Sequence, residues 1–255
     1  MEENQIKKFV KERYSKIATK EESYCSFSKG SQNMFEESQK QAKSRGYSKE
    51  QIQSIPIGAF YGLGCGNPTA IADIVAGETV LDLGSGGGID VFLASQKVGE
   101  TGNVIGVDMT REMVEKAVLN AREGGYGNVE FKLGEIENLP IEEGTIDLII
   151  SNCVINLTLD KSAAYTEAFR VLKQGGRIVV SDLVSEGYIP EKIRKNFHAW
   201  SDCISGAMEM DEYLDTIKKV GFKDVEVIES RFFTEPHMDE RLVGKIVSIQ
   251  VRAFK

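Results

Sequence analysis

Short apolar runs alternate with amphipathic segments along the chain from about residue 79 onward. The amphipathic segments, which begin near residues 89, 111 and 161, have the apolar spacing of helices. The apolar runs have the length and composition of strands, and five of them come first: "TVLDL", "NVIGVD", "NVEFKLG", "TIDLIISN" and "RIVVSD". Strands that alternate with helices predict a parallel sheet covered by helices on both faces.

The ends of these helices carry capping signals. Gly99 suits the C-terminal end of the first helix, and we expect the side chain of Thr110 to cap the start of the second. Asp160 is the expected cap of a helix over residues 161–172. A further helix, "MDEYLDTIKKVGF", precedes two successive runs, "DVEVIES" and "KIVSIQVRAF", which predict an antiparallel pair. The whole pattern predicts a seven-stranded, Rossmann-like α/β domain.

Residues 1–75 follow a different, helical pattern. "IKKFVKERYSKIA" is one helix candidate, and "SKEQ" has the spacing of a capping box, with Ser48 as the cap of a second helix. Asn67 followed by Pro68 places a cap and a first-turn proline ahead of "TAIADI". We expect a helical N-terminal extension at residues 1–75, joined through "YGLGCGNP" to a domain at residues 76–255.

Composition and charge disfavour several classes of protein. The 255 residues carry a net charge of −8, and no run of lysine and arginine interleaves with aromatics, which disfavours a nucleic-acid surface. The charged first residues are not a secretory signal, and no apolar run reaches the length of a membrane span. We expect a cytoplasmic monomer that binds neither membrane nor nucleic acid. Four cysteines without a C-x-x-C pair predict reduced thiols rather than a zinc ribbon or a disulfide framework.

The glycine-rich loop "LDLGSGGG" lies between a predicted strand and a predicted helix, the context that a nucleotide cofactor requires. Its glycines let the backbone approach a ligand, and the helix N-terminus favours a carboxylate or a phosphate. The NAD fingerprint would place a third glycine where this chain has Ile89. Asp82 and Asp90 flank the loop and would repel a pyrophosphate. A ligand with a sulfonium, an ammonium and one carboxylate tolerates them, so the loop favours S-adenosylmethionine.

Further cofactor contacts are expected at the carboxyl ends of the strands. Asp108 ends the second strand, where it can accept hydrogen bonds from both ribose hydroxyls, as in NAD sites. Glu135 and Ile136 follow the third strand and are expected beside the adenine, and Asn152 ends the fourth strand. The predicted cofactor-binding residues are Asp82, Gly84, Ser85, Gly86, Asp108, Met109, Glu135, Ile136 and Asn152.

Three of the four cysteines fall on segments that this fold can bring together above a methyl donor. Cys153 follows Asn152 at the carboxyl edge of the sheet, where open α/β sheets bind ligands. Cys65 lies among glycines in "GLGCGNP", and Cys203 lies in the connection after the fifth strand, in a lid expected around residues 186–210. A single cysteine is more often a small buried apolar residue, but the three together predict a thiophilic substrate.

Trivalent arsenic is a substrate that suits three thiols beside a methyl donor. It takes three sulfur ligands and keeps a lone pair, which can attack a sulfonium methyl with no proton to remove. Methylation of carbon or oxygen usually needs a general base, and this chain has only two histidines, His198 and His237. A mechanism without a base therefore suits this composition.

Six motifs resemble those of the arsenite S-adenosylmethionine methyltransferases: "GLGCGNP", "DLGSGGGID", "GVDMT", "LGEIENLP", "ISNCVINL" and "CISGA". The resemblance implies a class I methyltransferase that methylates arsenite or methylarsenite in arsenic detoxification. It implies that Cys65, Cys153 and Cys203 bind arsenic and that Cys25 forms a disulfide with the site cysteines during turnover. It also implies an external thiol reductant, thioredoxin or glutathione. Many members have a cysteine where this chain has Val91, and we infer that this cysteine is dispensable for arsenic binding.

Three alternatives stay open at this point. A C-methyltransferase of quinones or similar small molecules would need a base and an apolar pocket but not the cysteines. A metalloid-binding or sensor protein would keep the cofactor fold without turnover. An NAD-dependent reductase is disfavoured by Ile89 and Asp82.

Overall fold

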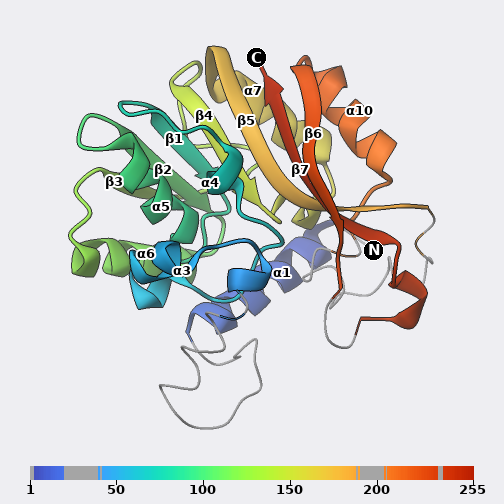
Figure 1. The fold of residues 1–255 in the computed structure, drawn as a ribbon, viewed down its shortest axis with the longest axis horizontal. Helices are drawn as coiled ribbons and strands as arrows, with labels where there is room; N and C mark the ends of the chain where they lie inside the picture. Colours follow the sequence, from blue (N-terminus) through green and yellow to red (C-terminus); the bar gives the residue numbers. More distant parts are fainter. Residues whose placement is uncertain are drawn as a thin grey trace, which may run out of the picture.

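A seven-stranded sheet with the order β3-β2-β1-β4-β5-β7-β6 forms the centre of the molecule (Figure 1). The computed structural model describes residues 3–19, 40, 42–187, 189, 204, 206–234 and 238–255. The pairings of β1 to β5 are parallel, whereas β7 lies antiparallel between β5 and β6. The predicted α/β class, the seven strands and the antiparallel pair at the end of the chain are confirmed.

The strands match the apolar runs of the sequence. Their bounds are Thr79–Leu83 (β1), Asn103–Asp108 (β2), Val129–Leu133 (β3), Ile146–Asn152 (β4), Leu172–Ser185 (β5), Lys223–Phe232 (β6) and Ile246–Phe254 (β7). Only β5 differs much from its predicted range of 177–182, since it begins directly after a helix, where Leu172 pairs with Ile146.

Alternate residues of the central strands face opposite layers of helices, as the pleat of a strand requires. Leu81 and Ile149 belong to a core cluster with residues of α7 (Lys161–Val171) and α10 (Met210–Val220). Val80, Leu148 and Ile150 face the other way and pack against α5 (Ile89–Val98). Within the described residues, the other helices are α1 (Glu3–Ala18), α3 (Lys49–Gln53), α4 (Pro68–Ile71), α6 (Arg111–Gly124), and the 3₁₀ turns η1 (Ile57–Ala59), η2 (Ile155–Leu157) and η3 (Glu240–Leu242).

Three of the four predicted N-terminal caps are present. Ser48 forms both hydrogen bonds of the capping box, and the side chains of Asn67 and Asp160 each accept a hydrogen bond from the first turn of their helices. The prediction for Thr110 is wrong, because its side chain makes no capping hydrogen bond. The Thr110 N–H instead donates to Asp108 Oδ1 at 2.8 Å, so the carboxylate two residues upstream fixes the start of α6.

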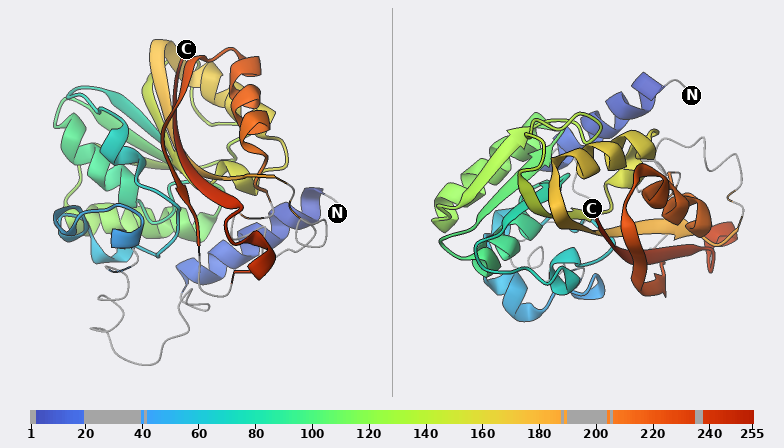
Figure 2. Two further views of the ribbon diagram at one scale, coloured as in Figure 1. Left: turned by 45° about the vertical axis from the view of Figure 1, so that its right-hand side comes forward. Right: turned by 90° about the horizontal axis from the view of Figure 1, so that it is seen from above.

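The N-terminal segments pack against the sheet domain at the carboxyl edge of the parallel strands. Figures 1 and 2 show α1 crossing below this edge, where its residue Ile6 lines the same cavity as Gly84 and Asp108. None of the described helices combines the length and the apolar character needed to cross a membrane. The division at residue 75 stays a prediction, and Cys25 and Cys203 lie outside the described residues.

Candidate active site

A cavity at the carboxyl edge encloses about 1220 Å³ of space that opens to solvent. The glycine loop forms its floor, the ends of β2 and β4 form its sides, and α1 lies over it. Eight of the nine predicted cofactor-binding residues line this cavity: Asp82, Gly84, Ser85, Gly86, Asp108, Met109, Ile136 and Asn152. Cys153 lines it as well, so one of the predicted substrate thiols lies beside the predicted cofactor residues.

The glycine loop follows β1 in a conformation that requires glycine at Gly84. This residue has φ +68°, and a Cβ there would lie 2.3 Å from a side-chain carbon of Val154. Two residues later, the Gly86 N–H donates to Asp108 Oδ2 at 2.9 Å. The loop therefore lies close against the ends of both β2 and β4, and its backbone faces the cavity.

Three buried carboxyl groups make the floor of the cavity acidic. Burial raises the pKa of Asp82 well above its usual range, and the neighbouring Asp90 and Asp108 raise it further. Burial also raises the pKa of Asp90, to about 6, and that of Asp108. No hydrogen bond from a described residue offsets the burial of Asp82. A ligand that carries an ammonium and a sulfonium would supply the missing positive charge.

Two hydroxyl groups in the cavity wall also lack partners. The Ser85 Oγ and the Tyr61 hydroxyl are buried and form no hydrogen bond with any described residue. Burial raises the pKa of Tyr61 to about 12, so its hydroxyl stays a donor at neutral pH. Buried polar atoms of this kind normally have a partner. The unpartnered hydroxyls and the acidic floor fit a zwitterionic, ribose-bearing ligand such as S-adenosylmethionine.

The side chain of Asn152 holds the loop that carries Cys65. Its Oδ1 accepts from the N–H groups of Cys65 at 2.9 Å and of Gly66 at 3.2 Å, and its Nδ2 donates to the Gly66 carbonyl at 2.8 Å. Nδ2 also donates to the Tyr47 hydroxyl at 2.9 Å. The amide is thus committed to the Cys65 loop, and a contact with adenine stays a prediction.

Tyr47 connects Asn152 with the acidic floor of the cavity. Its hydroxyl accepts from Asn152 and donates to Asp90 Oδ1 at 2.9 Å. Burial, with the charge of Asp90 beside it, raises the pKa of Tyr47 well above its usual range. Sequence reasoning gave Tyr47 no role, because nothing near it in the chain indicates a partner 43 residues away.

Other distant segments hold the Cys65 backbone from the opposite side. The Cys65 carbonyl accepts from Arg231 Nη2 at 2.9 Å and from Ser248 Oγ at 3.0 Å. Gly64, just before it, has φ +92°, and a Cβ there would lie 2.8 Å from the Asn152 amide. The Cys65 position is therefore fixed by residues from three other strands, β4, β6 and β7.

Cys153 has an unusual backbone conformation for a residue other than glycine. Its φ is +62°, in the left-handed region, and its N–H donates to the Ser181 carbonyl at 2.7 Å. Such residues carry about 1–3 kcal/mol of strain and concentrate at functional sites. The conformation turns the chain at the end of β4, so that Cys153 faces Cys65.

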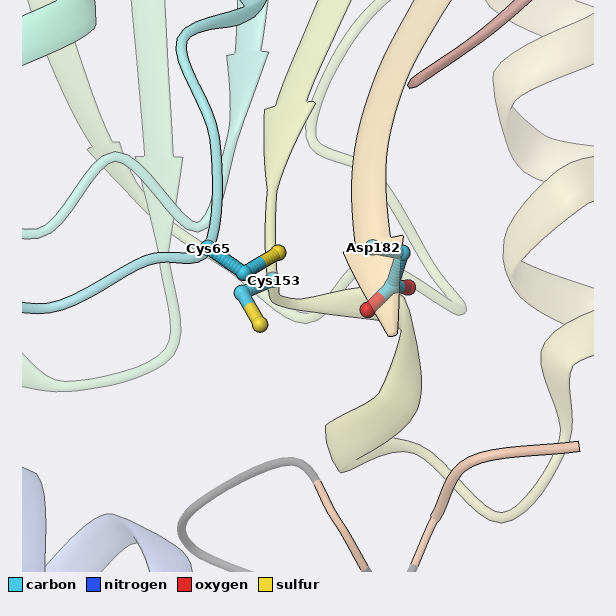
Figure 3. Close-up of side chains that lie close together, drawn as sticks. All are labelled: Cys65, Cys153 and Asp182. Atoms are coloured by element: carbon cyan, nitrogen blue, oxygen red, sulfur yellow. The ribbon is translucent and has the colours of Figure 1, made fainter. Parts of the chain in front are cut away.

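Cys65, Cys153 and Asp182 form one buried cluster (Figure 3). Their two sulfur atoms and a carboxylate oxygen all lie within 4.8 Å of one another. The hydroxyl of Tyr213 donates to Asp182 Oδ2 at 3.1 Å, and that of Tyr165 donates to Tyr213 at 2.7 Å. Burial raises the pKa of Asp182 to about 7. Neither cysteine is in a disulfide.

Comparisons with known proteins agree with this geometry. The family model of a methyltransferase domain matches residues 74–236. An arsenite methyltransferase of Halobacterium salinarum is 38% identical over 261 residues, which cover 98% of this chain and 67% of that protein. The crystal structure of an arsenic(III) S-adenosylmethionine methyltransferase from Chlamydomonas reinhardtii has a TM-score of 0.69 and 36% identity, and the match covers 84% of this chain and 73% of that one.

The chain belongs to the arsenite methyltransferase family. The resemblance found in the sequence motifs is confirmed, and with it the class I methyltransferase fold. The human arsenite methyltransferase is 38% identical over 204 residues, which cover 75% of this chain and 54% of that protein. The chain spans about two thirds of the archaeal relative and about half of the human one.

The family departure at Val91 lies away from the cavity. Val91 is fully buried within α5 and packs in the cluster of Val80 and Leu148 beneath the sheet. A cysteine at this position would therefore point into the core. That such a cysteine is dispensable for arsenic binding stays a prediction.

Helix α1 contributes cavity residues that the sequence did not indicate. Ile6, Lys7 and Tyr14 line the cavity from this helix. The Lys7 ammonium donates to Glu135 Oε2 at 2.6 Å and to Glu137 Oε1 at 3.5 Å. Glu137 lines the cavity, but the predicted residue Glu135 lies outside the lining and is exposed.

Proposed function

We propose that this protein transfers a methyl group from S-adenosylmethionine to trivalent arsenic held by cysteine thiols. The observation that carries the proposal is the pair Cys65 and Cys153, whose sulfur atoms lie within 4.8 Å of each other. Cys153 also lines the cavity whose floor is the acidic glycine loop. Membership of the arsenite methyltransferase family supports arsenite and methylarsenite as the substrates.

In this proposal the cavity holds the methyl donor by charge and by hydrogen bonds. Asp82 and the loop at Gly84–Gly86 hold the methionine end, and Asp108 holds the ribose. Ile136 and Glu137 flank the adenine. When bound, S-adenosylmethionine supplies an electrophilic methyl group on a sulfonium. The acidic floor offsets the two positive charges of the donor, and α1 shields it from water.

The thiols supply the substrate site in this proposal. Cys65, Cys153 and Cys203 displace hydroxide groups from arsenite, and each thiol proton leaves with a hydroxide as water. The arsenic lone pair then attacks the methyl carbon, so that an arsenic–carbon bond forms while the carbon–sulfur bond breaks. No proton is removed in this step, so the step needs no general base.

Arsenic loses two electrons in each transfer and becomes pentavalent. Its return to the trivalent state takes two electrons, which a pair of thiols supplies by forming a disulfide. We propose that Cys25 takes part in this disulfide and that thioredoxin or glutathione reduces it. A reducing, cytoplasmic setting and a role in arsenic detoxification follow from this proposal.

The experiment that tests the proposal is methyl transfer by the purified protein with labelled S-adenosylmethionine, arsenite and excess thiol. Cys65→Ser and Cys153→Ser should each lower transfer by about 100-fold or more, because serine cannot replace a soft thiolate ligand. S-adenosylmethionine binding should stay unchanged in both variants. Ser95→Ala, a similarly small buried change in α5, is the matched control and should keep full activity.

Two outcomes would contradict the proposal. Retained transfer to arsenic in both cysteine variants would remove the thiols from the substrate site. Cofactor binding without any transfer to arsenic in the unmodified protein would favour a carbon acceptor such as a quinone.

A further inference from the structure

The third member of the buried cluster, Asp182, has no role in holding arsenic by sulfur. Trivalent arsenic selects thiolates, whereas a carboxylate is a hard oxygen donor that suits metal cations. We propose that Cys65, Cys153 and Asp182 also form a binding site for a divalent d¹⁰ cation, Zn²⁺ or Cd²⁺. Such a cation competes with arsenic for the two thiols. The competition rests on the proposed function, whereas the cation site itself does not require that arsenic binds.

The geometry of the cluster is close to that of a tetrahedral metal site. Its three donor atoms come from the loop before α4, the end of β4 and the interior of β5, and all lie within 4.8 Å of one another. Zinc–sulfur bonds of about 2.3 Å and zinc–oxygen bonds of about 2.1 Å place tetrahedral donors roughly 3.5–3.8 Å apart. Inward side-chain movements of about 1 Å therefore close the site. The fourth position is left for water or another donor.

Hydrogen bonds to both oxygens hold the carboxylate of Asp182 in place beside the thiols. Oδ2 accepts from the Tyr213 hydroxyl, and Oδ1 accepts from the Leu183 N–H at 2.9 Å. A carboxylate has about four lone-pair positions, so it keeps capacity for a metal. Hydrogen-bonded partners behind a ligand are typical of metal sites, where they fix its orientation.

The charge of the cluster distinguishes the binding of a divalent cation from the binding of arsenic. When a cation displaces the protons of both thiols and of Asp182, the cluster carries three negative charges, and the ammonium of Lys161, which acts on Asp182, offsets one of them. A divalent cation neutralises the remaining two. Arsenic bound by thiolates is already neutral, so it gains nothing from Asp182. The prediction is that removal of the Asp182 charge weakens cation binding and leaves arsenic binding unchanged.

The test is a titration of the reduced full-length protein with Cd²⁺, followed by the ultraviolet charge-transfer absorption of cadmium thiolates. Asp182→Asn should weaken Cd²⁺ binding at least tenfold, the lower end of the effect of altering groups around a metal. Cys65→Ser and Cys153→Ser should weaken it further. Asp147→Asn is the matched control: Asp147 lies at the opposite end of β4, paired with Lys173, and its removal should leave Cd²⁺ binding unchanged.

The same variants separate this proposal from the proposed function. Arsenite binding to Asp182→Asn should stay within about twofold of the unmodified protein. If the unmodified protein binds Cd²⁺ at this cluster but not arsenite, the proposed function fails and the cation site stands. Equal Cd²⁺ affinity in the unmodified protein and in Asp182→Asn overturns the cation site.

A second measurement needs no substitution at the buried Asp182. Zinc X-ray absorption on the protein loaded with one equivalent of Zn²⁺ reports the donors directly. The expected shell has sulfur at about 2.3 Å together with oxygen at about 2.0–2.2 Å. A shell of sulfur alone, or one without sulfur, would overturn the assignment even if Asp182→Asn does not fold.

Discussion

The cofactor end and the thiol end of the cavity are built in opposite ways. At the cofactor end, Asp82, the glycine loop and Asp90 lie within nine consecutive residues, and local backbone turns bring them together. At the thiol end, Cys65 is held by hydrogen bonds to residues 87, 166 and 183 positions away. A short sequence motif therefore determines the cofactor end, whereas the thiol end forms only when distant segments come together in the folded chain.

The two ends also differ in how their polar groups are satisfied. The cofactor end has an acidic floor and two hydroxyls without partners, so its polar groups are completed by a ligand. The backbone of the thiol end is held on both sides by Asn152, Arg231 and Ser248. We infer that the cofactor end keeps its function whether its ligand is bound or released. At the thiol end, by contrast, a small displacement of the Cys65 backbone is enough to disrupt the site.

Among the changes that leave the cysteines in place, the largest effect is expected from Gly64→Ala, which acts first on the loop that carries Cys65. The new Cβ would lie 2.8 Å from the Asn152 amide at a residue with φ +92°, so the Cys65 loop must move. A misplacement of about 1 Å can lower a rate by about 100-fold. We expect arsenic methylation to fall by about this factor, while the dissociation constant of S-adenosylmethionine, measured by calorimetry, changes by less than about threefold.

Gly125→Ala is the matched control for this prediction. Gly125 has a similar φ of +70°, but a Cβ there would meet no atom within 4 Å. It should show the strain of the left-handed conformation, about 1 kcal/mol in the free energy of unfolding, and full activity. Equal losses of activity in the two variants would show that strain, rather than displacement of Cys65, is responsible.

A smaller effect is expected from removing the Asn152 amide. Asn152→Leu leaves the N–H groups of Cys65 and Gly66 without their acceptor, at about 1–3 kcal/mol for each buried group. We expect kcat/KM for arsenite to fall by about tenfold or more, with a lesser change in S-adenosylmethionine affinity. Asn152→Asp keeps the acceptor and should recover part of the loss.

The control for Asn152 is an amide that holds backbone elsewhere. Asn128 Nδ2 donates to the carbonyls of Ser95 and Gly99, away from the cavity. Asn128→Leu should lower the melting temperature comparably and leave kcat/KM for arsenite unchanged. A larger loss of cofactor affinity than of arsenite turnover in Asn152→Leu would instead support the predicted adenine contact.

The fold could be predicted almost completely from the sequence, because strands and helices differ in the spacing of their apolar residues. The prediction of the Thr110 cap was wrong: the Asp108 carboxylate, two residues earlier, accepts from the N–H of Thr110, and the Thr110 side chain makes no capping hydrogen bond. The start of β5 was missed because Gly175 and Gly176 separate Leu172 from the apolar run, whereas Leu172 still pairs with Ile146 ahead of a register shift. Both errors arise where two elements meet and where one neighbour's contact overrides a local preference.

The site could be predicted in part, in proportion to how local its contacts are. The glycine loop and Asp108 were found from contiguous patterns. Tyr47 was missed because its partners are 43 and 105 residues away. Asp182 did carry a usable signal: like Asp108, it is an acidic residue near the carboxyl end of a buried parallel strand. This position indicates a functional residue only once the structure shows Cys65 and Cys153 beside it.

The acidic floor should make the cofactor end dependent on pH. Asp90 has a pKa of about 6 in the folded protein, so lowering the pH from 7 to 5 protonates it and removes a charge that a cationic ligand needs. We expect S-adenosylmethionine to bind about tenfold more weakly at pH 5 than at pH 7. Calorimetry across this range checks the prediction, and Asp90→Asn should flatten the profile.

The same raised pKa fixes the sign of the effect on stability. Because the pKa of Asp90 in the folded protein lies above its ordinary value of 3.8, the folded state binds more protons between about pH 4 and pH 6. The contribution of Asp90 to the free energy of unfolding therefore falls as the pH rises through this window. Lys173 lowers the pKa of Asp147, so the contribution of Asp147 to the free energy of unfolding depends on pH in the opposite sense. Asp147→Asn is the control, and it should leave the pH effect of Asp90 intact.

The smallest effect is expected from Glu135→Gln at the outer rim of the cofactor end. Glu135 pairs with Lys7 at 2.6 Å, but the two side chains are 51% and 31% exposed. An exposed ion pair contributes about 0–1 kcal/mol, so S-adenosylmethionine affinity should change by less than about threefold. Glu137→Gln should have the larger effect, because Glu137 lines the cavity and accepts from the Thr158 hydroxyl at 2.6 Å. The reverse order, measured by calorimetry at one salt concentration, would return Glu135 to the cofactor site and place the adenine nearer to α1.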